Sequence, residues 1–282
     1  MKLIEEQILQ KVIQKRPTTG FKGTFGKVLV VGGNANMGGA ALMSGSAAVH
    51  AGAGLVTIAT NKDNLTAVHA ALPEAMAINY WDKVPFAESI EKADVIVVGP
   101  GLGTDLHAQE ILKIVLSNVG MQQTLIIDGS AITMIAENHD LLEILPKSNL
   151  IFTPHQMEWQ RLSRIKIVDQ ENIQLNQQVQ QSLNATVILK KHHTQIYFKN
   201  KEVFELPIGG PYMATGGMGD TLTGILAAFI AQFKTKDVNE VIQAAVYTHS
   251  KIADELSSKK YVVLPSDIIS NLQSFMRKQI KD

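Results

Sequence analysis

Residues 27–41 read Lys-Val-Leu-Val-Val-Gly-Gly-Asn-Ala-Asn-Met-Gly-Gly-Ala-Ala, and this stretch sets the expected fold. Its first five residues are rich in branched apolar side chains, as in a strand buried on both faces of a parallel sheet. The glycines that follow are typical of a turn, and the small residues after them are typical of a helix packed closely on the sheet. The stretch therefore predicts a strand–turn–helix unit, the building block of an α/β protein.

The same unit recurs along the chain as far as residue 190. Short apolar runs alternate with stretches of helical periodicity, which is the pattern of successive βαβ units in a doubly wound sheet. We therefore expect an α/β fold with a central, mostly parallel sheet and helices on both of its faces. The predicted strands are 27–31, 55–59, 94–98, 124–127, 149–152 and 186–189, and the predicted helices are 39–50, 64–71, 106–116, 141–145, 157–162 and 171–183.

The two ends of the chain depart from this pattern. Residues 1–16 carry apolar side chains at helical spacing and predict an amphipathic helix. Residues 195–199 and 202–206 predict an antiparallel hairpin. No proline- or serine-rich linker and no internal repeat interrupts the chain, so we expect one domain spanning residues 1–282. Three helices are predicted after the hairpin, at 218–233, 238–255 and 265–277.

Composition restricts the partners and the compartment. The 26 lysines and arginines equal the 26 aspartates and glutamates, so bulk charge does not favour binding to nucleic acid or to an anionic membrane. The absence of cysteine excludes disulfides, thiolate zinc sites and cysteine nucleophiles, and it agrees with a reducing compartment. The apolar stretch 221–233 is too short to cross a bilayer, and residues 1–16 lack the apolar core of a secretory leader. We expect a soluble, cytoplasmic protein.

A glycine-rich loop leads into the helix predicted at 218–233. Residues 209–219 contain five glycines in eleven positions, and Asp220 follows directly. Glycines let backbone N–H groups approach a ligand, and a helix start favours negative charge, so the loop predicts an anion site, although not a P-loop. Asp220 would then accept a proton from a hydroxyl group beside a bound phosphate. The alternative is that Asp220 only stabilises the helix start.

Three other predicted strand ends carry unusual residues, and ligands of open α/β sheets bind at that edge. Residues 99–103, Gly-Pro-Gly-Leu-Gly, form an open turn whose backbone can approach a substrate. Asp128 ends the next strand and is either a wall of the site or a helix cap, with the cap favoured. His155 and Glu158 have the spacing of a capping pair, which is the commoner role for His-X-X-Glu at a helix start.

Residues 190–194, Lys-Lys-His-His-Thr, close the last predicted parallel strand. Without further information this segment is a solvated hairpin turn. Adjacent side chains in an extended chain point to opposite faces, so we do not expect His192 and His193 to hold one metal ion together.

The motifs taken together resemble a known family. Residues 215–224, Thr-Gly-Gly-Met-Gly-Asp-Thr-Leu-Thr-Gly, resemble the anion-hole and catalytic-base signature of the ribokinase-like superfamily. With the turn at 99–103 and the histidine at position 155, the chain resembles the ADP/ATP-dependent NAD(P)H-hydrate dehydratases from about Gly23 to Asp282. Members of that family repair hydrated NADH and NADPH by dehydration driven by ADP or ATP.

The resemblance implies a role for each matching residue. Asp220 would be the catalytic base, and Glu158 would organise Mg²⁺ indirectly. The sequence departs from the family pattern at Lys191, where glycine is usual, which puts the backbone geometry of that loop in question. The implied contacts of the hydrated dinucleotide are Ala40, Gly103, His155 and Asp220, those of the ADP nucleotide are Lys190, Lys191, His192, His193, Thr194 and Gly219, and the anion hole comprises Gly216, Gly217, Met218 and Gly219.

Two alternatives to the dehydratase remain open from the sequence. A small-molecule kinase of the same superfamily, acting on a sugar, hydroxymethylpyrimidine or hydroxyethylthiazole, would use the same base and anion hole. A non-catalytic nucleotide sensor would keep the pocket for binding alone. The resemblance also implies a homotetramer.

Overall fold

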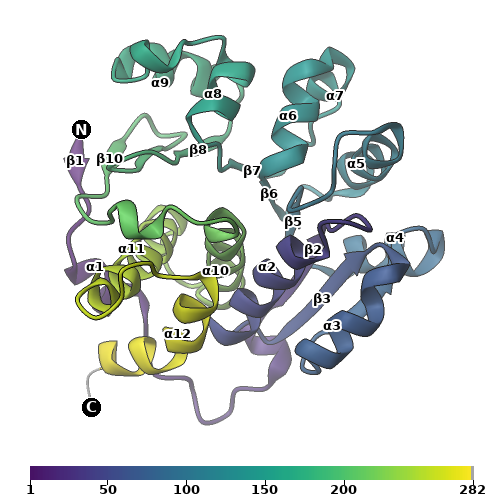
Figure 1. Ribbon diagram of the computed structural model, residues 1–282, viewed down its shortest axis with the longest axis horizontal. Coiled ribbons are helices and arrows are strands. Elements are labelled where there is room, and N and C mark those ends of the chain that lie inside the picture. The colour runs from purple at the N-terminus through teal and green to yellow at the C-terminus, as the bar shows by residue number, and fades with distance from the viewer. Residues whose placement is uncertain (281–282) are drawn as a thin grey trace.

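Within residues 1–280, which the computed structural model describes, ten strands form one sheet in the order β1-β10-β9-β8-β7-β6-β5-β2-β3-β4 (Figure 1). All neighbours from β8 to β4 pair in parallel, whereas β9 pairs antiparallel with both β8 and β10. The strands are β1 (Lys2–Leu3), β2 (Lys27–Val31), β3 (Leu55–Thr60), β4 (Met76–Asn79), β5 (Val95–Val98), β6 (Thr124–Ile127), β7 (Asn149–Phe152), β8 (Thr186–Leu189), β9 (Gln195–Tyr197) and β10 (Val203–Glu205).

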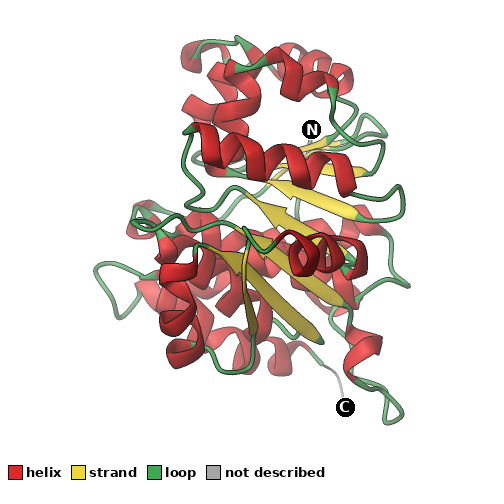
Figure 2. Ribbon diagram, turned by 90° about the vertical axis from the view of Figure 1, so that its right-hand side faces the viewer, coloured by secondary structure: helices red, strands yellow, loops and turns green. Residues whose placement is uncertain are grey.

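Helices cover both faces of this sheet (Figure 2), which confirms the predicted architecture. The helices are α1 (Gln7–Val12), α2 (Gly38–His50), α3 (Leu65–Ala71), α4 (Lys83–Lys92), α5 (Leu106–Asn118), α6 (Gly129–Glu137), α7 (His139–Glu143), α8 (Gln156–Ser163), α9 (Ile173–Ser182), α10 (Met218–Gln232), α11 (Val238–Ser257) and α12 (Pro265–Gln279).

Strand β2 shows why the apolar runs lack alternation with polar residues. Val28 and Val30 belong to a core shared with α1, α2, α3, α10, α11 and α12, whereas Leu29 and Val31 belong to a second core shared with α4, α5, α6, α7 and α8. Successive side chains of a strand point to opposite faces, and here each face is covered by helices. Both faces must therefore be apolar.

The structure corrects the predicted N-terminal helix. Residues 1–16 do not form one helix, because Lys2–Leu3 pair in parallel with β10 and α1 ends at Val12. The chain is already extended at Ile13, before Pro17. Pairing with the edge strand β10 therefore takes precedence over the helical periodicity at the start of the chain, and only residues 7–12 are helical.

Besides β1, three further strands or α-helices were missing from the prediction: β4, α4 and α6. Strand β4 is a half-exposed edge strand, so its sequence lacks a continuous apolar run. Helix α4 has Pro85 in its first turn, a position where proline is tolerated although the residue commonly marks a break. Helix α6 begins directly after Asp128; a helix cap was the favoured role for this residue, but no helix was predicted after it.

Candidate active site

A cavity of ≈ 780 Å³ lies where four of the predicted functional segments meet, those of Asp128, His155, Lys190 and Asp220. Its walls come from the carboxyl ends of β6, β7 and β8, from the loop before α10, and from α10 and α11. Asp128, His155, Glu158, Lys190 and Asp220 all line it. Residues far apart in the sequence therefore surround one space at the edge of the sheet where ligands of α/β proteins bind.

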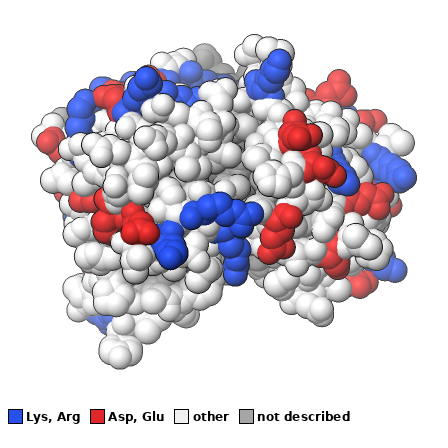
Figure 3. All heavy atoms as spheres, turned by 90° about the horizontal axis from the view of Figure 1, so that it is seen from above, with Lys and Arg blue, Asp and Glu red and all other residues white. Residues whose placement is uncertain are grey.

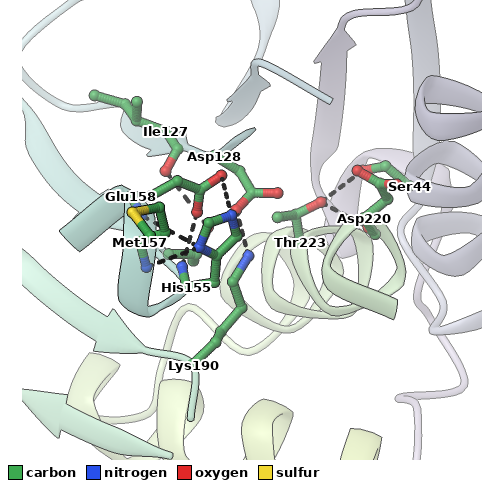
Figure 4. Close-up of polar contacts among 10 residues, drawn as sticks. Ser44, Ile127, Asp128, His155, Met157, Glu158, Lys190, Asp220 and Thr223 are labelled. Carbon is green, nitrogen blue, oxygen red and sulfur yellow. Dashed lines mark hydrogen bonds and ion pairs between the residues drawn. The ribbon is translucent and has the colours of Figure 1, made fainter. Parts of the chain in front are cut away.

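Asp220 lies in the first turn of α10 and lines the cavity. The backbone carbonyl of Asp220 accepts a hydrogen bond from Thr223 Oγ1 at 2.7 Å, and the same hydroxyl lies 3.0 Å from Ser44 Oγ on α2 (Figure 4). These contacts connect the helix start to the neighbouring helix, while the carboxylate itself is left facing the cavity. Burial raises the pKa of Asp220 to about 6, the charge of Asp128 adds to the rise, and Lys190 opposes it.

Lys190 and Asp128 form a buried ion pair beside Asp220. Lys190 Nζ lies 2.7 Å from Asp128 Oδ1, which also accepts a hydrogen bond from Thr153 Oγ1 at 2.6 Å. Burial alone would lower the pKa of Lys190, but attraction to Asp128, Glu158 and Asp220 outweighs burial and raises it. The lysine is therefore a permanent cation in a cavity that holds three carboxyl groups.

Asp128 corrects one prediction, since it does not act as a helix cap. It occupies the position before α6, yet its side chain makes no capping hydrogen bond. The carboxylate is turned toward Thr153 and Lys190 instead and is only 3% exposed. The ion pair with Lys190 holds this side chain in the wall of the cavity.

His155 and Glu158 cap helix α8 reciprocally, as the capping interpretation predicted. His155 Nδ1 accepts the N–H groups of Met157 and Glu158 at 3.1 and 3.2 Å, and Glu158 Oε2 accepts the N–H of His155 at 2.7 Å. Because Nδ1 is an acceptor, the neutral imidazole carries its proton on Nε2, which lies 3.4 Å from Glu158 Oε1. Burial and the charge of Lys190 lower the pKa of His155. Both residues also line the cavity, so the cap orients them toward it.

Glu158 is a second carboxyl group whose pKa lies near neutral pH. Burial raises its pKa to about 7; Lys190 lowers it, and Asp128 raises it. Glu158 and Asp220 thus flank one lysine and resist full ionisation together. Bound cations or N–H donors would favour the charged form of both.

The start of α10 supplies the N–H groups of the predicted anion hole. Gly217 has φ +90°, a conformation that favours glycine, and a Cβ there would lie 2.4 Å from Met43 Cε. Met218 and Gly219 line the cavity, and the N–H groups of a first helical turn have no acceptor inside their own helix. Gly216 and Gly217 precede this turn outside the lining. The arrangement can hold an anion next to Asp220 and Lys190.

Gly219→Ala is expected to weaken binding of the ADP that the sequence resemblance implies, without unfolding the protein. A Cβ at position 219 would lie 2.9 Å from Lys190 Nζ, so the ammonium group must move away from the helix start. Because that atom is the end of a flexible side chain, stability should change by less than about 1 kcal/mol. We expect the KM for ADP to rise on the order of tenfold. The control is Gly120→Ala in a remote loop, and equal KM values for the two variants would contradict the prediction.

Residues 190–194 all line the cavity. Two expectations about this segment need correction, one for the backbone at Lys191 and one for the rings of His192 and His193. Lys191 Nζ lies 2.6 Å from Glu171 Oε1, so its charge is directed to that surface carboxylate. The positive φ of the loop, 58°, falls on His193 and not on Lys191, which removes the steric objection to lysine in place of glycine.

The expectation that His192 and His193 point to opposite faces is wrong. Their rings stack at a centroid distance of 4.1 Å, because the left-handed backbone at His193 breaks the extended conformation on which the expectation depended. Stacking brings the two imidazoles together at the cavity wall.

Ala40 and Gly103 lie beside the cavity and not in its lining. Gly103 N–H donates to Ser130 Oγ at 3.1 Å, and Ser130 follows Gly129 of the cavity wall in the chain. Ala40 is one helical turn before Ser44 on α2, which packs against α10. Their contact with a substrate stays a prediction.

His249 on α11 was missed by the sequence analysis. Its side chain lines the cavity, is 5% exposed, and has an Nε2 atom without a hydrogen-bond partner among the described residues. Burial lowers its pKa to about 4, a hydrogen bond with the backbone of Met218 opposes this, and Lys190 lowers it further. No motif surrounds this histidine, so only the packing of α11 against α10 reveals it.

The carboxylates of the cavity fit an indirect role toward a metal ion. Within residues 1–280, no group of three or more His, Cys, Asp or Glu side chains is arranged to hold one. Oxygens of Asp128 and Glu158 are already engaged by Lys190 and by the N–H of His155. Mg²⁺ commonly uses one or two carboxylates with waters and substrate phosphates, so this donor set suits an ion carried by a nucleotide.

On the face shown in Figure 3, positive and negative side chains are interspersed, and no large patch carries charge of one sign only. Among the described residues, no helix has the length and apolar character needed to traverse a bilayer.

The fold and this site define the ribokinase-like class of α/β proteins. A solved structure from Enterococcus faecalis, described as a ribokinase-like superfamily protein, matches with a TM-score of 0.94 at 45% identity and covers 100% of this chain and 97% of that one. A family model described as NAD(P)H-hydrate dehydratase matches residues 28–274. The chain belongs to the NAD(P)H-hydrate dehydratase family.

Two enzymes illustrate the relationship. An ADP-dependent (S)-NAD(P)H-hydrate dehydratase from Enterococcus faecalis is 46% identical over 278 residues, which are 99% of this chain and 94% of that protein. The structure of an ADP/ATP-dependent NAD(P)H-hydrate dehydratase from Bacillus subtilis, co-crystallized with ATP/Mg²⁺, has a TM-score of 0.85 at 24% identity, covers 99% of this chain and 98% of that one, and shares the fold.

Proposed function

We propose that this protein catalyses the ADP-dependent dehydration of the S-epimer of hydrated NADH and NADPH. The observation that carries the proposal is the carboxylate of Asp220, which lines the cavity beside Lys190 and the N–H groups at the start of α10. Membership of the NAD(P)H-hydrate dehydratase family selects the substrate among hydroxyl compounds. The base and the anion site alone would serve a kinase equally well.

The first step transfers a phosphoryl group to the ring hydroxyl of the hydrated nicotinamide. Asp220 accepts the hydroxyl proton as the oxygen attacks the terminal phosphorus of ADP, and the bond from that phosphorus to the bridging oxygen breaks to release AMP. Lys190 and the N–H groups of Met218 and Gly219 stabilise the negative charge on the transferred group. His155, with its proton on Nε2, can donate a hydrogen bond to the substrate.

The second step removes phosphate and restores the dihydronicotinamide. The lone pair of the ring nitrogen expels the phosphate group, which leaves more readily than hydroxide. Loss of a proton from the neighbouring ring carbon then re-forms the carbon–carbon double bond. This elimination needs little from the protein beyond positioning of the ring and exclusion of water.

Mg²⁺ bound to the nucleotide phosphates would be held through water by Glu158 and Asp128. When bound, the ion supplies positive charge that offsets the charge of the phosphates. Glu158, whose pKa of about 7 reflects burial, would become fully ionised beside such a cation.

The direct test mixes the protein with Mg²⁺, hydrated NADH and either ADP or ATP. Recovery of the reduced-nicotinamide absorbance together with release of inorganic phosphate supports the proposal. A stable phosphorylated product would indicate a kinase, and nucleotide binding without turnover would indicate a sensor. Comparison of the turnover with ADP and with ATP determines which nucleotide is the phosphoryl donor.

The rate is expected to depend on pH through Asp220. A base must be ionised to accept a proton, and the pKa of Asp220 is about 6, so kcat/KM should fall as the pH decreases below about 6 and level off above it. The measurement is kcat/KM between pH 5 and 8, at about half-unit steps. Glu158→Gln should keep this acidic limb, whereas Asp220→Asn should lose it in its residual activity. The reverse pattern would assign the limb to Glu158.

We also propose that the protein is cytoplasmic and forms a homotetramer, as the family resemblance implies. The absence of cysteine supports a reducing compartment. Size-exclusion chromatography with light scattering would determine the oligomeric state.

A further inference from the structure

A second cavity of ≈ 360 Å³ lies at the same edge of the sheet, beyond the ends of β5, β2, β3 and β4. Its volume is within the range of small-molecule sites. The proposed reaction makes no use of it. The residues that give it chemical character are Asn34, Asn61, Tyr80, Trp81, Asp105 and His107.

Gly103 lies between the two cavities. Gly129 lines the first cavity, and the adjacent Ser130 accepts the N–H of Gly103 at 3.1 Å. On the other side, a Cβ at position 103 would lie 2.8 Å from Nδ2 of Asn34, which lines the second cavity. The ends of β6 and β3 are three strand spacings apart, about 14 Å. A ligand made of two nucleosides joined by a pyrophosphate can place one end in each cavity.

The walls of the second cavity suit a nucleoside. The Trp81 ring makes edge-to-face contacts with Tyr80 and His107, each at a centroid distance of 5.7 Å, and remains partly exposed. An aromatic face of this kind stacks on any base. The amide groups of Asn34 and Asn61 lie at the same cavity and can hydrogen-bond the edge of a base or a ribose.

The charge of the second cavity is negative. Asp105 lines it, and the described lining contains no lysine or arginine. Burial raises the pKa of the Tyr80 hydroxyl, a hydrogen bond with Asn61 opposes this, and the charges of Asp105 and Asp63 raise it further. In dinucleotide sites a carboxylate pairs with a free ribose 2′-hydroxyl, whereas a 2′-phosphate requires a cation.

We propose that the second cavity binds the adenosine end of the hydrated dinucleotide and favours hydrated NADH over hydrated NADPH. The inference rests on the proposed function and extends it to the half of the substrate that does not react. The damaged ring lies at Asp220, the pyrophosphate passes Gly103, and the adenine stacks on Trp81. The 2′-phosphate of hydrated NADPH meets the charge of Asp105.

The first test removes the stacking surface. Trp81→Ala should raise the KM for hydrated NADH on the order of tenfold and leave the KM for ADP unchanged, whereas Trp81→Phe should restore most of the affinity. The control is Phe21→Ala, which removes a 70% exposed aromatic ring before β2, at the opposite edge of the sheet. Circular dichroism establishes that each variant is folded.

The second test removes the charge but keeps the helix cap. Asp105 Oδ1 accepts the N–H of Ala108 at 2.8 Å, and asparagine caps a helix as well as aspartate does. The wild-type protein should have a kcat/KM about fivefold higher for hydrated NADH than for hydrated NADPH, and Asp105→Asn should narrow that ratio.

The outcomes separate this inference from the proposed function. Normal turnover with kinetics in Trp81→Ala and Asp105→Asn equal to those of Phe21→Ala would overturn the adenosine site alone. Absence of turnover with either hydrated substrate would overturn the proposed function. In that case calorimetric titration with NADH still decides on the cavity, because Trp81→Ala must weaken NADH binding if the adenine stacks there.

Discussion

Asp220→Asn is expected to lower kcat for dehydration by a factor on the order of 10²–10⁴ while ADP binds as before. Asparagine has the shape of aspartate, so α10 should begin at the same residue. It cannot accept the proton of the substrate hydroxyl at neutral pH, however, and the oxygen then attacks phosphorus far more slowly. The measurement combines steady-state kinetics with calorimetric titration of ADP.

The comparison for this variant is Asp140→Asn, which changes an exposed carboxylate in the first turn of α7, outside the cavity lining. Its kinetics should match those of the wild-type protein. Full activity in Asp220→Asn would remove the base from the mechanism, and loss of ADP affinity along with activity would show that the carboxylate acts mainly in binding.

Lys190→Met should affect stability and nucleotide binding together. The substitution leaves Asp128 buried without its cation, which costs about 3 kcal/mol of unfolding free energy. It also removes the cation that faces the phosphates, so ADP affinity should fall roughly 10- to 100-fold. Because Lys190 opposes the rise in the pKa of Asp220, that pKa should move above about 6. Denaturant unfolding and titration calorimetry measure the first two effects.

A double variant separates the two roles of Lys190. In Lys190→Met/Asp128→Asn the buried carboxylate of Asp128 is replaced by a neutral amide, so most of the stability should return while ADP affinity stays low. Lys234→Met is the matched control, because its ion pair with Asp94 at 2.8 Å is exposed and contributes at most about 1 kcal/mol. Recovery of ADP affinity in the double variant would contradict a direct role of Lys190 in binding the nucleotide.

The sequence identified residues of the cavity wall where the pattern that marks them is local in the chain. Asp220, Gly219 and Met218 adjoin a glycine-rich helix start, and this geometry is set by neighbours in the chain. His155 and Glu158 were predicted as a capping pair for the same reason, since all three hydrogen bonds of the cap span three residues or fewer. Their second role, as part of the cavity wall, depends on where α8 lies.

Local sequence patterns could not predict contacts between segments that are distant in the chain. Lys190 and Asp128 are 62 positions apart in the sequence. They form an ion pair because the sheet places only β7 between β8 and β6, so the carboxyl ends of these two strands lie close together. His249 reaches the cavity because α11 packs on α10. Asp128 was expected to cap its helix, but a buried lysine attracts the carboxylate more strongly than a helix N–H does.

The sequence by itself determined the alternation of strands and helices, the parallel sheet and the glycine-rich start of α10, because apolar periodicity and glycine content act over a few residues. Only the tertiary structure decided which loops share a cavity. Strand β2 lies between β5 and β3, and this order brings Asn34, Tyr80 and Trp81 together at a second cavity. Strand order is a property of the whole packed core, whose free energy no single segment carries.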